Sequence, residues 1–198
     1  MRKKILPGIV VALMSLVLVF SVFSVPAFAA TSLKKATVSI SATYYTYTGK
    51  TIKPAVTVKV GKKKVSSKNY TVSYKNNKSV GKATITVKGK GSYKDSATKS
   101  FYIRPKKVAS LKATPYSTKV KLSWGKVTGA KGYQVYQYED GSWKKLPTTS
   151  STSCTVSKLE SATEYKFKVR AYAKAGSKSL YSSSFTTVTT TTTIGKPT

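Results

Sequence analysis

The sequence predicts an all-β protein made of two tandem antiparallel β-sandwiches that follow a signal peptide. Apolar and polar residues alternate with a period of two in nearly every segment after residue 30, and no window there shows the 3.6-residue period of an amphipathic helix. Gly and Asn separate these segments at short intervals, as the tight turns of an antiparallel sheet require. The chain has 198 residues, so the part after the signal peptide is too long for one ordinary sandwich and fits two.

A signal peptide is predicted over residues 1–29. Residues 2–4 are Arg-Lys-Lys, residues 5–23 are uncharged and mostly apolar, and residues 25–29 read Val-Pro-Ala-Phe-Ala, with the small residues that signal peptidase recognises. The alternative is a retained membrane anchor, because the apolar run approaches the roughly 20 residues of a spanning helix, although Pro7 shortens it. We therefore expect a secreted, extracellular protein, with association to the cell wall as a further option.

The first sandwich is predicted over residues 31–104. Apolar positions alternate with polar ones along its segments, and turn residues such as Gly49, Gly61 and Asn76 lie between the segments. Short strands with one apolar face pack as an antiparallel sandwich. The positions expected to face its core are Val38, Ile40, Val56, Val58, Val60, Tyr70, Val72, Tyr74, Ala83, Ile85, Val87, Phe101 and Ile103.

Four motifs cover nearly the whole of this first domain. They are Tyr-Thr-Tyr-Thr-Gly-Lys at 45–50, Lys-Pro-Ala-Val-Thr-Val at 53–58, Asn-Tyr-Thr-Val-Ser-Tyr-Lys-Asn-Asn at 69–77, and the segment 80–93. With these motifs the domain resembles the short bacterial Ig-like repeats found in surface and secreted proteins of Gram-positive bacteria. The resemblance implies a β-sandwich and says little about a ligand.

Residues 105–107, Pro-Lys-Lys, are predicted to form a hinge. Proline cannot donate a hydrogen bond to a β-ladder, and the flanking charges resist burial. Because the hinge is short, we expect the two domains in an end-to-end arrangement with limited swing.

A second domain is predicted over residues 108–188. Residues 119–124 read as a strand that ends on a tryptophan, residues 132–138 read as the next strand, and residues 159–171 read Leu-Glu-Ser-Ala-Thr-Glu-Tyr-Lys-Phe-Lys-Val-Arg-Ala. With these motifs the domain resembles a fibronectin type III domain. The resemblance implies a core that contains Trp124, Leu159, Tyr165 and Phe167.

The same resemblance implies a tyrosine corner, in which the Tyr165 hydroxyl bonds back to the preceding loop. Ala162 stands where the family often has proline, a departure expected only to loosen that loop. The sequence has no Arg-Gly-Asp, so integrin-type adhesion is not supported. Residues 189–198 are predicted to be a threonine-rich, solvated tail. It carries no Leu-Pro-x-Thr-Gly sorting motif.

The residue inventory argues against catalysis. The sequence has no histidine, one cysteine and five acids, so nucleophilic triads and zinc sites lack their usual residues. Glu139 and Asp140 are neighbours in a predicted turn and cannot oppose each other as acid and base. Cys154 alternates with Val156 and is predicted to be a buried, unreactive thiol. We expect no enzyme activity, no cofactor and no metal.

The charge predicts an anionic partner. The formal net charge is +31, and basic residues outnumber acids by 17 to one in residues 31–104 and by 16 to four in residues 105–198. Lysines on strands also protect sheet edges and aid solubility, but far less imbalance would serve those ends. We therefore expect a monomeric structural, spacer or adhesion protein that adsorbs to wall teichoic acid, anionic polysaccharide or extracellular DNA, without sequence-specific nucleic-acid binding. The lysines expected to contribute are Lys59, Lys62, Lys63, Lys64, Lys88, Lys121, Lys166 and Lys168.

The 14 tyrosines support an alternative, a carbohydrate-binding module protein that recognises a glycan through aromatic rings. Four of them, Tyr70, Tyr74, Tyr133 and Tyr165, fall on apolar phases and are expected in the cores. Those near turns or on the opposite phase are candidates for an exposed platform. They are Tyr44, Tyr93, Tyr116, Tyr138 and Tyr181.

Overall fold

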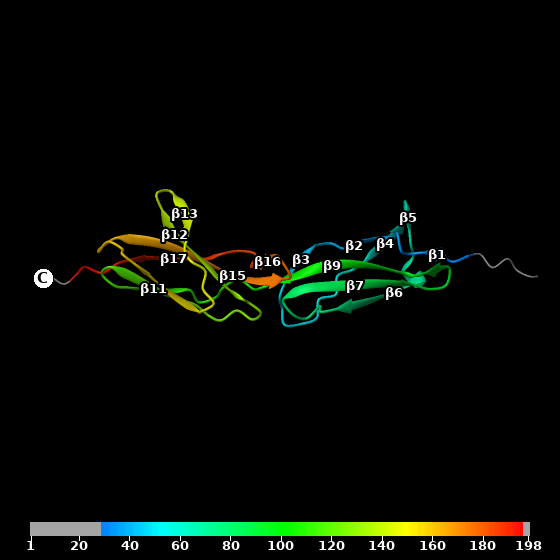
Figure 1. Cartoon of the computed structure of the whole chain (residues 1–198), viewed down its shortest axis with the longest axis horizontal. Coiled ribbons are helices and arrows are strands. Elements are labelled where there is room, and N and C mark those ends of the chain that lie inside the picture. The colour runs from blue at the N-terminus through cyan, green and yellow to red at the C-terminus, as the bar shows by residue number, and fades with distance from the viewer. Residues whose placement is uncertain (1–28, 196–198) are drawn as a thin grey trace, which may run out of the picture.

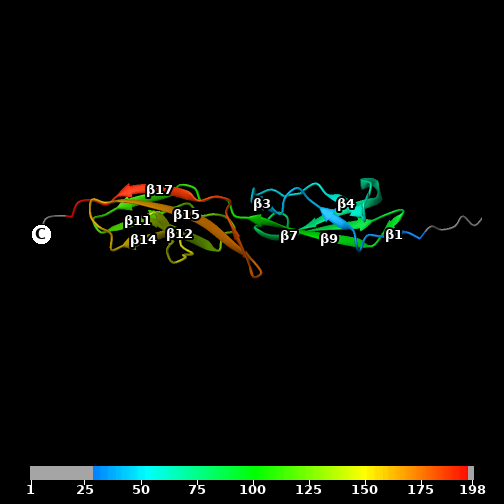
Figure 2. The same cartoon turned by 90° about the horizontal axis from the view of Figure 1, so that it is seen from above.

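The computed structural model describes residues 29–195, and the predicted signal peptide therefore lies outside the described residues except for Ala29. Two all-β domains lie end to end along the long axis of the molecule (Figure 1). The view from above shows the same arrangement (Figure 2). Over residues 29–195 the single helical element is the 3-10 turn Ser67–Asn69, and no helix there is long and apolar enough to cross a membrane. The prediction of two β-sandwiches is confirmed.

The first domain consists of two facing sheets and a short parallel strand pair. One sheet has the order β2-β4-β5, the other has the order β3-β9-β7-β6, and β1 pairs with β8. The strands are β1 (Thr31–Ser32), β2 (Thr37–Ser39), β3 (Tyr44–Thr46), β4 (Thr57–Val60), β5 (Lys63–Lys64), β6 (Tyr70–Lys75), β7 (Gly81–Gly89), β8 (Tyr93–Lys94) and β9 (Ser96–Arg104).

Alternation along β7 and β9 builds the core of this domain. Ala83, Ile85 and Val87 on β7 are fully buried, as are Phe101 and Ile103 on β9, and polar residues lie between them. Strands with one apolar face must cover that face, so the second sheet packs over it. Side-chain hydrogen bonds between residues far apart in the sequence fix the loops. The Tyr74 hydroxyl donates to the Pro54 carbonyl at 2.7 Å, and the Asn77 side chain donates to the Ile52 carbonyl at 2.9 Å.

The second domain is also a two-sheet sandwich. One sheet has the order β10-β11-β14, and the other has the order β13-β12-β15-β16, with β17 also paired to β15. The strands are β10 (Lys112–Pro115), β11 (Lys119–Ser123), β12 (Gly132–Glu139), β13 (Ser142–Lys145), β14 (Ser153–Ser157), β15 (Glu164–Ala175), β16 (Lys178–Tyr181) and β17 (Thr186–Thr191).

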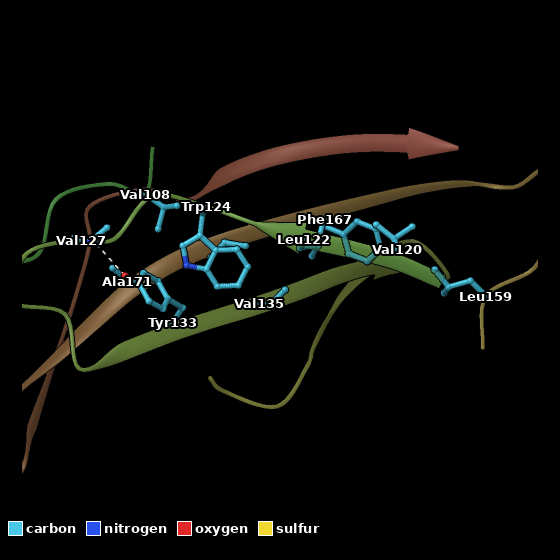
Figure 3. Close-up of a cluster of buried hydrophobic side chains, with 11 residues drawn as sticks. Val108, Val120, Leu122, Trp124, Val127, Tyr133, Val135, Leu159, Phe167 and Ala171 are labelled. Carbon is cyan, nitrogen blue, oxygen red and sulfur yellow. Dashed lines mark hydrogen bonds between the residues drawn. The ribbon is translucent and has the colours of Figure 1, made fainter. Parts of the chain in front are cut away.

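Trp124 lies at the centre of the second core (Figure 3). Its ring packs edge-on against Tyr133, with ring centroids 5.3 Å apart, and the Tyr133 hydroxyl accepts a hydrogen bond from the Val127 N–H at 2.9 Å. Leu159 and Phe167 are buried in the same cluster, and Tyr165 packs against it half-buried. The Trp124 Nε1 is buried and has no hydrogen-bond partner among the described residues.

The tyrosine corner is present. The Tyr165 hydroxyl accepts a hydrogen bond from the Glu160 N–H at 2.9 Å, so it bonds back to the loop before β15. Ala162 in that loop has φ of 51°, a left-handed conformation that the proline ring excludes. The loop conformation therefore accounts for the absence of proline at this position.

Two details differ from the sequence-based expectations. β17 continues to Thr191 in register with Glu164 of β15, beyond the predicted domain end at 188, and the buried Thr192 hydroxyl donates to the Glu160 carbonyl at 2.6 Å. Threonine suits this role because it is β-branched and carries a hydroxyl. Cys154 on β14 is half-buried against the core, less enclosed than expected, and burial raises the pKa of its thiol.

The domains contact each other directly. β16 contacts β9 and β15 contacts β7, because the β15–β16 hairpin projects beyond the second sandwich toward the first (Figure 1). Gly129 has φ of +74° and lies so close to Val80 of the first domain that an added Cβ would come within 2.6 Å of it. Pro105, in the predicted hinge, is buried. The two sandwiches therefore meet through packed side chains.

Replacing Trp124 by Ala should destabilise the second domain by roughly 3–5 kcal/mol, because it empties the centre of the core. Trp124→Phe should cost less, since it keeps an aromatic ring and removes the unpartnered buried N–H. Urea denaturation followed by circular dichroism measures both. A Trp124→Ala protein that unfolds within a few degrees of the parent in thermal melts would contradict this role.

Lys59 and Lys64 are direct cross-strand partners in β4–β5. Like charges directly opposite each other are unfavourable, so Lys64→Glu should stabilise the first domain by roughly 0.2–1 kcal/mol. The gain should shrink with added salt. Lys62→Glu is the matched control, because it changes the net charge equally in the turn before β5. Equal melting temperatures for the two variants at low salt would show that the pairing has no effect.

Candidate binding surface

The predicted lysines do not converge on one site. Lys59, Lys63 and Lys64 lie on the β2-β4-β5 sheet with Lys62 in its turn, whereas the others are divided among the three remaining main sheets. Seven are exposed and Lys168 is half-buried. The structure brings together Lys59 with Lys64, and Lys166 with Lys168 on one face of β15. The members on the other three sheets are Lys88 on β7, Lys121 on β11, and Lys166 and Lys168 on β15.

The acids neutralise little of this charge. Within residues 29–195 the ion pairs both involve Lys144, whose ammonium lies 2.8 Å from Asp140 and 3.3 Å from Glu139. Hydrogen bonding to Asp140 and then to Glu139 raises the pKa of Lys144. These three residues lie at the β12–β13 turn, and no other lysine within residues 29–195 is paired with an acid. The surface field is therefore positive over both domains.

Aromatic rings take the place of acids beside several cations. Residues alternate between two faces along β12 and β15, and the faces that point away from the core carry aromatics on β12 and cations on β15. Tyr136 is directly opposite Lys168, and Tyr138 is directly opposite Lys166. Several cations here lie over aromatic rings in cation–π contacts. We call the residues at and beside β12, β15 and β16 that make these cation–π contacts the cation–aromatic strip. Its members are Lys166, Lys168, Arg170 and Lys178 with Tyr44, Tyr102, Tyr136, Tyr138, Trp143, Tyr181 and Phe185.

Lys168 lies among three rings. Its ammonium is 4.1 Å from the Trp143 ring centroid, 4.5 Å from that of Phe185 and 5.2 Å from that of Tyr136. Burial, and then the charge of Arg170, lowers the pKa of Lys168. Cation–π contacts of this kind contribute about 0.5–1 kcal/mol each at exposed sites. The rings thus hold the ammonium in place without a carboxylate.

Arg170 continues the strip toward the first domain. Its guanidinium lies 4.1 Å from the Tyr181 ring centroid and 4.7 Å from that of Phe185, and its Nε donates to the Gln134 side-chain oxygen at 2.8 Å. Gln134 is directly opposite Arg170 and is buried beneath this layer. Arg170 therefore has a fixed position on the outer face.

The strip ends on the first domain. The Lys178 ammonium on β16 lies 4.8 Å from the Tyr102 ring centroid and 5.3 Å from that of Tyr44, and these two rings stack with centroids 5.7 Å apart. Contact with the Tyr44 hydroxyl raises the pKa of Lys178. The strip thus links both domains along one face.

Sequence reasoning found Lys166 and Lys168 but missed Trp143 and Phe185. Trp143 had a detectable signal, because the Asp140-Gly141 turn places it directly opposite Tyr138. Phe185 lies between β16 and β17, where the alternation is interrupted, so no periodic signal marks it.

The tyrosines named in the sequence analysis fall into buried, half-buried and exposed groups. Tyr133 is buried, while Tyr70, Tyr74 and Tyr165 are half-buried against the cores. The exposed ones, at 40–43% exposure, are Tyr44, Tyr116 and Tyr138. Each of the three has a lysine ammonium within 6 Å of its ring centroid. Tyr93 and Tyr181 are half-buried.

Residues 29–195 contain no cluster of three or more His, Cys, Asp or Glu side chains that could hold a metal ion. The Cys154 thiol has a raised pKa, whereas a reactive cysteine needs a lowered one.

The fibronectin type III domain family model matches residues 104–188, beginning four residues before the predicted start. Among solved structures, the chain is similar to FN3tt at 28% identity, over 46% of this chain and 97% of that one, with a TM-score of 0.41. A fibronectin type III domain derived from human KIAA0970 protein is 22% identical, over 46% of this chain and 76% of that one, with a TM-score of 0.36. The chicken CNTN1 FN1–FN3 domains are 17% identical, over 57% of this chain and 42% of that one, with a TM-score of 0.36.

No curated protein matches the chain. Fibronectin type III domains are typical of extracellular proteins and are typically non-catalytic. Residues 104–188 are a fibronectin type III domain, and another β-rich region precedes it.

Proposed function

We propose that this is a secreted, non-catalytic surface, spacer or adhesion protein that adsorbs to anionic polymers outside the cell through lysines spread over both domains. The observation that carries the proposal is the distribution of charge. Lysines occupy the outer faces of all four main sheets, and within residues 29–195 only Lys144 is paired with acids. A surface of this kind attracts a polyanion from many directions and releases its counterions on contact.

The proposal includes the two interpretations of the N-terminal half. Residues 1–29 are interpreted as a signal peptide that directs the chain out of the cell, and residues 31–104 as a bacterial Ig-like repeat. Both rest on sequence pattern, and the second is compatible with the two-sheet topology of the first domain. A basic sandwich pair outside the cell meets wall teichoic acid, anionic polysaccharide and extracellular DNA.

Charge supports this function better than stacking on a neutral glycan does. A glycan platform needs free, roughly coplanar ring faces, whereas Tyr138 and Trp143 are tilted by 62° to each other. The Lys166 ammonium lies 5.8 Å from the Tyr138 centroid, and the Lys168 ammonium lies 4.1 Å from the Trp143 centroid. The aromatic rings of this face are therefore already engaged with cations.

We expect binding to teichoic acid or DNA to fall by orders of magnitude between low and several hundred millimolar salt, because each phosphate contact releases counterions. Single changes such as Lys88→Ala or Lys121→Ala should each reduce the salt slope by about one unit at most. Affinity measured at several salt concentrations provides the slope. A neutral glycan is the comparison ligand. Binding that is insensitive to salt, or that one lysine variant abolishes, would contradict distributed adsorption.

A further inference from the structure

One pocket lies between the two domains and is lined by both. Tyr44 and Arg104 contribute from the first domain, while Arg170 and the segment Ser179–Ser182 contribute from the second. Its volume is about 290 Å³. A water molecule occupies about 30 Å³ in the liquid, so this junction pocket has room for a carboxylate or phosphate group.

The junction pocket holds an unusual share of the arginines. Arg104 and Arg170 are the only arginines of the sequence after residue 2, although the chain has 36 basic residues in total. Both line this one pocket. The guanidinium differs from the lysine ammonium because its planar fork donates two parallel hydrogen bonds to an oxyanion. Two forks at one place suit an oxyanion far better than scattered ammonium groups do.

The hydrogen bonding of the two arginines is incomplete. Arg170 uses its Nε to bond Gln134, which holds the group in place. Arg104 Nε is buried and has no hydrogen-bond partner among the described residues. A buried donor without an acceptor is unfavourable, and no carboxylate lines the pocket to supply one. The packing within the chain therefore explains the position of Arg170 and leaves the buried Nε donor of Arg104 without an acceptor.

The other lining groups favour an anion that belongs to a polar molecule. Ser179 and Ser182 bring hydroxyl groups, and Tyr44 and Tyr181 bring rings with hydroxyls. Lys178 lies beside the pocket over Tyr44 and adds positive charge at its edge. Among the groups that line it, the titratable ones are thus tyrosines and arginines, with no acid to repel an anion.

We propose that the junction pocket is a defined binding site for one oxyanion, a carboxylate or phosphate group carried by an anionic polymer. The forks of Arg104 and Arg170 bind the oxyanion, and the surrounding hydroxyls bind the polymer next to it. This inference rests on the proposed function only for the polymer that presents the group. The site itself depends on the two arginines and requires both domains.

The arginines allow a direct test by NMR. In the chain from Ala30 to Thr198, without added arginines, the Nε–Hε region of a ¹⁵N-labelled sample contains signals from Arg104 and Arg170 alone. Galacturonate supplies a carboxylate and glycerol phosphate supplies a phosphate, so titration with each distinguishes the two sources. We expect both arginine signals to shift and saturate together with at least one probe. Signals that stay in place with both probes would overturn the proposal.

Variants that keep the charge distinguish a site that needs the guanidinium group from attraction by the overall positive charge. Arg104→Lys should weaken probe binding by about tenfold, since one lost charge-assisted hydrogen bond corresponds to about that factor, so the Arg170 signal should shift only at correspondingly higher probe concentrations. Lys112→Ala, on the opposite sheet, removes a whole charge and should leave the arginine shifts in place. Unchanged binding in Arg104→Lys would overturn the site. Thermal melts check folding, and Arg170→Lys observed at the Arg104 signal provides the reciprocal experiment.

Polymer binding in the same samples tests the broader function independently. Salt-sensitive polymer binding without arginine shifts retains the proposed function and rejects the pocket. Saturable shifts with the small probes, in a protein that does not bind the polymers, retain the pocket and reject the proposed function.

Discussion

The pairing of β12 with β15 determines both the inside and the outside of the second domain. In this register Val135 faces Val169 in the core, and Tyr136 faces Lys168 on the opposite side. Because side chains alternate strictly along a strand, a slip of one residue would turn the cations into the core and the apolar residues into solvent. The register that buries the apolar side chains in the core therefore also determines where the cation–aromatic strip lies.

The strip is a way to hold cations in a protein that has few acids. The sequence has five acids against 36 basic residues, so most lysines have no carboxylate to pair with. A ring face attracts a cation without adding a charge, so the ammonium keeps its net positive charge. The cost is self-repulsion, which the two cores must overcome without an internal disulfide, since Cys154 is the only cysteine.

Local pattern predicted the sandwiches, and long-range contacts account for what it missed. Period-two alternation and the Trp124 and Tyr165 motifs are signals within one or two strands, and the structure places Trp124, Leu159 and Phe167 inside. The three-ring setting of Lys168 depends on residues from β12, β13 and the β16–β17 connection. Arg104 and Arg170 are 66 positions apart, and no motif of the sequence indicates that they share a pocket.

The placement of the chain ends gives the molecule a mechanical property. The described chain begins at one end of the long axis and finishes at the other, with the long strands running broadly along that axis (Figures 1 and 2). The hydrogen bonds between β15 and β17 lie perpendicular to the strands. A force that pulls the two ends apart acts along the strands, so it loads these hydrogen bonds together in shear rather than one at a time. Resistance to pulling is then governed by the unfolding barrier of each sandwich. Pulling on the two ends of the described chain is therefore opposed by many hydrogen bonds at once.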